Sequence, residues 1–215
     1  LTQYAEATGD PRVIPFLDRY FRFQLQTLPA QPLSMWAAAR GQEQLLPMLW
    51  LYRKTGEPYL LELATLLRKQ SYDWGGFFTH FPYEKTTHAY LSRPLFMAAK
   101  RVTLIQDWTA KRSKKARVKQ GKPIIPPKPK TAEEIEKGNA SPFLRAFHQT
   151  HGVNLAMALK MPALDALFGG GAEGFAAVQA GFDAIERYHG LANGLFSGDE
   201  HLNGRSPAVG AELCL

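Results

Sequence analysis

The sequence is poor in cysteine and in long apolar runs. The 215 residues include one cysteine, Cys214, so no internal disulfide can form. No stretch of about 18 uninterrupted apolar residues occurs, so the sequence predicts no membrane span. Hydrophobic residues make up 45% of the chain and charged residues 21%. This composition is typical of a packed globular chain and excludes long disorder, collagen and disulfide scaffolds.

The two ends of the sequence also lack familiar features. The chain begins at Leu1 rather than at Met, and the basic and apolar regions of a secretory signal are absent. It ends at Leu215 in an apolar stretch. We therefore expect residues 1–215 to form part of a larger domain whose two ends are truncated.

Positive charge is concentrated in one segment. The formal net charge is +7, and residues 111–130 hold nine Lys or Arg and no acid, so the rest of the chain carries 7 − 9 = −2. Four prolines in the same segment disfavour helix and sheet. We interpret residues 111–130 as a basic, proline-rich insert that is extended and solvated. Clustered cations can bind a polyanion, but no aromatic residue in the segment could stack on bases, so nucleic acid is not an expected partner.

Apolar residues recur mostly with helical spacing. Leu45, Met48, Leu49 and Tyr52 follow i, i+3, i+4, i+7. A Thr-Gly-acid-Pro pattern occurs at 4–11 and again at 52–58 (YAEATGDP and YRKTGEP), with an offset of 47 residues. Glycine suits the end of one helix and proline the start of the next. The sequence thus predicts an all-α chain of helical-hairpin repeats, which could stack into a closed toroid or an open solenoid.

Two regions interrupt the helical pattern and are predicted as long loops. Residues 72–83 are rich in aromatic residues and glycine, and residues 188–212 are rich in glycine, acids and histidine. In a helical toroid such loops lie at one end and line the cavity. Their aromatic side chains could stack on sugars or could pack between helices; these candidates, with one from an earlier segment, are Trp36, Trp74, Phe77, Phe78 and Tyr83.

Four residues could carry chemistry together. Glu200 and Glu212 could divide acid and base roles if their environments separate their pKa values. Glu212 and Cys214 form a Glu-x-Cys pair that offers an oxygen and a thiolate to a metal such as zinc. His151 stands at a predicted helix start. Taken singly, each is more typical of a solvated surface or a packed core than of a functional site.

The blocks that contain these residues resemble a known family. HGVNLAMALK at 151–160, HGLANGLFSGDEHLNGRSP at 189–207 and GAELC at 210–214 are similar to the β-L-arabinofuranosidases of glycoside hydrolase family 127. RGQEQLLPMLWLYRKTGEPYLLELA at 40–64 is similar to an earlier helical repeat of that family. The resemblance implies an (α/α)6 barrel and a retaining hydrolase of L-arabinofuranosides in plant-type glycans.

The resemblance also implies a role for each residue. Glu212 would be a zinc ligand and the general acid/base, and Cys214 a second zinc ligand. Glu200 and His151 would bind the sugar. The family's nucleophile is a zinc-held cysteine, which we expect beyond Leu215, so we expect the isolated chain to be inactive. Gln42 stands where relatives often carry a sugar-binding histidine, and its amide can hydrogen-bond a hydroxyl but cannot titrate.

A different class of function remains open. The chain could be a non-catalytic helical scaffold that binds polyanions or proteins through residues 111–130. Such binding would weaken steeply with salt, whereas a glycosidase would turn over or bind furanosides.

Overall fold

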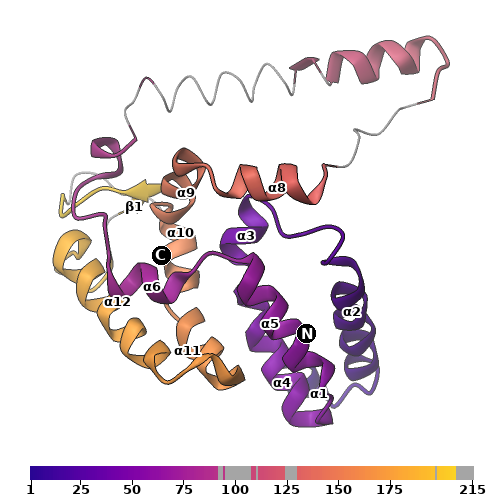
Figure 1. Ribbon diagram of the computed structural model, residues 1–215, viewed down its shortest axis with the longest axis horizontal. Helices are drawn as coiled ribbons and strands as arrows, with labels where there is room; N and C mark the ends of the chain where they lie inside the picture. Colours follow the sequence, from indigo (N-terminus) through magenta and orange to yellow (C-terminus); the bar gives the residue numbers. More distant parts are fainter. Residues whose placement is uncertain (92–93, 95–107, 110, 124–129, 197, 207–215) are drawn as a thin grey trace.

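Helices make up most of the part of the chain that the structure describes. The computed structural model describes residues 1–91, 94, 108–109, 111–123, 130–196 and 198–206. Within these ranges helices dominate (Figure 1), which confirms the all-α class. The elements are α1 (Thr2–Thr8), α2 (Val13–Thr27), α3 (Trp36–Arg40), η1 (Gly41–Gln44), α4 (Leu45–Thr55), α5 (Tyr59–Gln70), α6 (Trp74–Thr79), η2 (Thr87–Ala89), α8 (Ala132–Asn139), α9 (Pro142–Gln149), α10 (Gly152–Ala158), α11 (Met161–Asp165), η3 (Ala166–Gly170), α12 (Glu173–His189), β1 (Gly198–Asp199) and β2 (His201–Leu202). No helix in these ranges is long and apolar enough to cross a membrane.

The repeated Thr-Gly-acid-Pro pattern forms the predicted turns. Gly9 ends α1 and Gly56 ends α4, with φ values of 65° and 70°. Each glycine amide donates to the carbonyl four residues earlier, at 2.8 Å in both cases. This left-handed cap favours glycine because a Cβ would be strained there. The hairpin prediction is therefore confirmed at both sites, and the (α/α)6 barrel stays a prediction.

The first part of the core lies between α2, α4 and α5. Figure 1 shows these helices side by side. Their facing sides bury a continuous apolar cluster at i, i+3, i+4 spacing, including Phe21, Leu45, Leu60 and Leu63. Burial of such side chains stabilises a fold by about 1.5–3 kcal/mol each. The periodicity read from the sequence identifies this part of the core correctly.

The second part of the core lies where α6, α10, α11 and α12 meet, and it includes a segment predicted as a loop. Residues 74–79 form α6 instead, because Asp73 caps the helix by accepting a hydrogen bond from the Gly76 amide at 2.9 Å. The aromatic side chains of this segment point inward. The packing alternative is thus the correct one for four of the proposed sugar platforms, Trp74, Phe77, Phe78 and Tyr83.

The basic segment is also partly helical. Residues 111–119 form a helix, so the expectation of an extended insert is wrong there. The four prolines all follow residue 122, and the preceding Lys, Arg and Ala residues have good helix propensity. The expected solvation is confirmed, since the side chains from 111 to 123 are exposed except for the half-buried Arg117. Residues 124–129 lie outside the described ranges.

Candidate functional site: a histidine cluster beside the Glu200 turn

The head of α10 is the centre of the candidate site. His151 is the N-cap residue of α10, with extended backbone angles, and its Nδ1 accepts a hydrogen bond from the Asn154 amide at 3.4 Å. A side-chain acceptor at this position satisfies one of the free amides of the first helical turn. The imidazole of His151 is therefore fixed at the start of the helix, as the sequence predicts.

The acidic turn around Glu200 lies against this helix start. β1 and β2 pair antiparallel on either side of Glu200, whose φ is 65°. The Gly152 amide donates to the Glu200 carbonyl at 3.0 Å, and the Leu202 amide donates to the Thr150 carbonyl at 2.9 Å. Two of the predicted sugar-binding residues, His151 and Glu200, thus come together from distant parts of the sequence. The side chain of Glu200 is exposed.

Three imidazoles and an indole gather at this junction. The Trp36 ring lies 4.6 Å from the His148 ring and 5.0 Å from the His151 ring, centroid to centroid. The His151 and His201 rings are 5.4 Å apart. We call Trp36, His148, His151 and His201 the histidine cluster. Trp36 is half-buried, so one predicted sugar platform lies at the site, unlike the four in the core.

Two of these histidines are held neutral at pH 7. Burial, and then the nearby charge of His151, lowers the pKa of His148 and of His201 to about 4. The Nδ1 atom of His148 is hydrogen-bonded to the Tyr72 hydroxyl at 2.8 Å. The Nδ1 atom of His201 is hydrogen-bonded to the Thr150 hydroxyl at 3.1 Å. His148 and His201 are therefore the neutral imidazoles of the cluster.

Arg40 and Asn154 connect the cluster to α3. The Arg40 Nε atom donates to Asn154 Oδ1 at 2.7 Å, and Asn154 Nδ2 donates to the His148 carbonyl at 2.8 Å. The Arg40 guanidinium carbon lies 4.9 Å from the centroid of the Trp36 ring, in cation–π geometry. Sequence reasoning missed both residues. The only signal was their place inside the two family-like blocks.

His189 fixes the turn from the opposite side. Its Nδ1 accepts from the Gly204 amide at 3.0 Å, so its Nε2 carries the proton and donates to the Tyr83 carbonyl at 2.7 Å. Burial lowers its pKa. This histidine therefore ties the end of α12 to the segment that follows β2.

Gln42 lies in a different environment from His151 and Glu200. It is buried, and its Nε2 donates to the Tyr72 carbonyl at 3.5 Å. It lines a cavity of about 520 Å³ whose lining includes Arg68, Asp165 and Glu173 but none of the histidine cluster. The Arg68 Nε donates to Asp165 Oδ1 in this cavity at 2.6 Å. The structure thus does not bring Gln42 to the other predicted sugar-binding residues.

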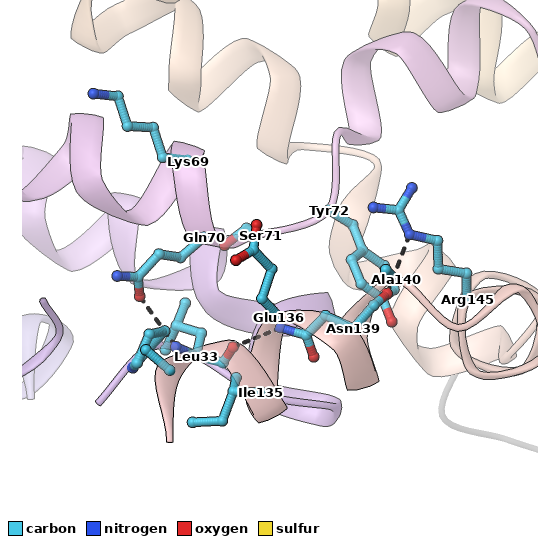
Figure 2. A pocket seen from close by; sticks show the side chains of 12 residues that line it. Leu33, Lys69, Gln70, Ser71, Tyr72, Ile135, Glu136, Asn139, Ala140 and Arg145 are labelled. Atoms are coloured by element: carbon cyan, nitrogen blue, oxygen red, sulfur yellow. Dashed lines mark hydrogen bonds between the residues drawn. The ribbon is translucent and has the colours of Figure 1, made fainter. Parts of the chain in front are cut away.

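Another cavity, of about 380 Å³, lies between α5 and α8. Figure 2 shows hydrogen bonds among some of its lining residues, including Leu33, Asn139 and Arg145. Asn139 Nδ2 donates to the Leu33 carbonyl at 2.8 Å, and Arg145 Nε donates to the Asn139 carbonyl at 3.2 Å. These hydrogen bonds hold α8 against the segment before α3, so we regard this cavity as a packing feature.

The predicted zinc ligands, Glu212 and Cys214, lie outside the described residues. Within the described ranges, no group of three or more His, Cys, Asp or Glu side chains could hold a metal ion. The residues that are described, including the three imidazoles, therefore do not by themselves fit a zinc site. Zinc remains a prediction from the resemblance.

Comparison with known proteins gives no relative. No family model, no curated protein and no solved structure matches the chain.

Proposed function

We propose that the chain contains the sugar-binding site of a glycoside hydrolase of the β-L-arabinofuranosidase type, formed by His151 and Glu200. The observation that carries the proposal is the hydrogen bond from the Gly152 amide to the Glu200 carbonyl. It joins two blocks of the family resemblance that are far apart in the sequence.

The chemistry of the site suits a sugar. The exposed carboxylate of Glu200 can accept hydrogen bonds from two hydroxyl groups. The half-buried ring of Trp36 can contact the apolar face of a furanose, with Arg40 stacked on the ring. The imidazole nitrogens of His151 can exchange hydrogen bonds with a sugar hydroxyl. By resemblance, Glu212 would protonate the leaving oxygen.

Binding of a neutral furanoside is the deciding experiment. We expect methyl α- or β-L-arabinofuranoside to perturb the NMR signals of the histidine cluster in the 215-residue chain. Glu200→Gln and His151→Ala should each weaken binding about tenfold or more, because hydrogen bonds to a sugar hydroxyl contribute about 0.5–1.5 kcal/mol each, and bonds to a charged group contribute more.

The matched control is His80→Ala, which removes an exposed imidazole outside the cluster. It should leave binding unchanged. Absence of binding to any furanoside by the folded chain would reject the proposal. So would equal losses in the control and in the two site variants.

A further inference from the structure

One exposed helix presents a stripe of cations that the proposed sugar site does not use. Lys111, Lys115 and Lys119 recur every four residues, so they follow one another on one face of the helix, about 6 Å apart along the axis. Arg112 lies beside them, with its guanidinium carbon 5.0 Å from the centroid of the Trp108 ring. We call these five residues the basic stripe.

The basic stripe is accessible. Trp108 is 58% exposed, and the three lysines and Arg112 are exposed. Figure 1 shows this helix lying away from the packed helices. The exposed Trp108 ring therefore offers an apolar face next to the cations.

Local bonds define the end of the helix. Gly121 has a φ of 63°, and the Lys122 amide donates to the Arg117 carbonyl at 2.9 Å. The Arg117 Nε donates to the Pro123 carbonyl at 2.8 Å. The left-handed glycine and these two hydrogen bonds cap the C-terminal end of the helix. The helical spacing of the three lysines therefore places them on one face.

We propose that the basic stripe binds an anionic polysaccharide, with the lysines facing its acidic groups and Trp108 against a sugar ring. Residues 111–123 hold seven Lys or Arg and no acid, and the single Asp107 just before Trp108 leaves the segment strongly positive. Regularly spaced cations on one face complement a polymer whose acidic groups repeat along a chain. The choice of a polysaccharide rests on the proposed function.

The composition of the stripe also argues against nucleic acid. Proteins that bind single strands place successive bases on several aromatic rings. The basic stripe offers a single aromatic ring among its five residues. The cations repeat along this surface, whereas the aromatic ring occurs once.

The test uses the 215-residue chain and polygalacturonate as the probe. We expect binding that weakens as NaCl rises from 50 to about 300 mM, since association releases counterions. The variant Lys111→Gln/Lys115→Gln/Lys119→Gln should lose about tenfold or more in affinity and show a flatter salt dependence, while keeping its helical circular dichroism. Trp108→Ala should lose affinity with an unchanged salt dependence, and Trp108→Phe should restore part of it.

The matched control removes the same charge elsewhere, at the exposed Lys54, Lys85 and Lys137, each changed to Gln. It should retain binding. Equal losses in the two triple variants, tighter binding of single-stranded DNA than of polygalacturonate, or no binding at 50 mM NaCl would each overturn the proposal. Furanoside binding at His151 is measured with a neutral ligand, so its loss or retention is distinguishable from this result.

Discussion

Lowering the pH from 7 to 5 should destabilise the fold through His148 and His201. Burial lowers the pKa of each imidazole from 6.5 to about 4. Between these values the unfolded chain binds a proton at each site that the folded chain excludes. The unfolded state therefore binds more protons, and the free energy of unfolding rises with pH across this window. Stability is thus lost as the pH falls from about 6.5 towards 4.

The magnitude follows from the size of the shift. A shift of 6.5 − 4 = 2.5 corresponds to about 3 kcal/mol for each histidine, at about 1.4 kcal/mol per pH unit. The two together would offset a large part of the 5–15 kcal/mol of a typical domain. Charging His148 is costly because its Nε2 is buried with no hydrogen-bond partner among the described residues. The positive charge of Arg40 acts in the same direction.

Urea unfolding followed by circular dichroism between pH 7.5 and 4.5 measures this effect. The chain should lose about 2–3 kcal/mol per pH unit near pH 5. His148→Gln keeps a hydrogen-bonding group towards Tyr72 but removes one titration, so it should reduce that slope by about 1.4 kcal/mol per pH unit. The control, His80→Gln, removes an exposed imidazole and should leave the slope unchanged. A flat stability profile from pH 7 to 5, or an NMR pKa of His148 near 6.5, would refute the reasoning.

Two substitutions in the packed helices test the fold by the same urea assay. Gly174→Ala should destabilise the protein by about 1–3 kcal/mol, because the added Cβ would collide with the Pro162 carbonyl where α12 crosses α11. Its control is Gly138→Ala in α8, where a Cβ meets nothing, and which should be neutral or stabilising by up to about 1 kcal/mol; the opposite order would contradict the packing. Leu63→Ala removes a fully buried side chain between α2 and α5 and should cost about 2–5 kcal/mol, so a loss below 1 kcal/mol would argue against this core.

The sequence predicted correctly those features that depend only on neighbouring residues. The Thr-Gly-acid-Pro turns at Gly9 and Gly56 could be predicted because a left-handed cap depends on one residue type. Helical periodicity likewise identified the face of α4 that contains Leu45 and Met48. Such features need no knowledge of what the segment packs against.

The sequence-based prediction was wrong where the average composition of a segment hid a local helix signal. The glycines and aromatic residues of 72–83 indicated a loop, yet one cap at Asp73 and burial of the rings stabilise α6. In 111–130 the prolines indicated an extended segment, although they can prevent helix formation only after residue 122. Composition averaged over a segment conceals the point at which helix propensity ends.

The candidate site divides in the same way. His151 and Glu200 could be named from their motifs, and the structure places them together. Arg40 and Asn154 could not be predicted, because they lie 114 positions apart in the sequence and neither belongs to a motif of its own. Side-chain networks of this kind depend on tertiary packing, which residue spacing does not encode.

The position of the Glu200 turn consequently depends on both sides of the junction. On one side, the backbone bond from Gly152 holds the turn to α10, whose head is in turn bonded to Arg40 through Asn154. On the other, His189 bonds Gly204 just beyond β2. The φ of 65° at Glu200 costs about 1 kcal/mol for a residue with a Cβ. A conformation of this kind persists only when the surrounding contacts determine it. Both sets of bonds therefore hold the backbone of the Glu200 turn, and loss of either should displace the turn before the helical core unfolds.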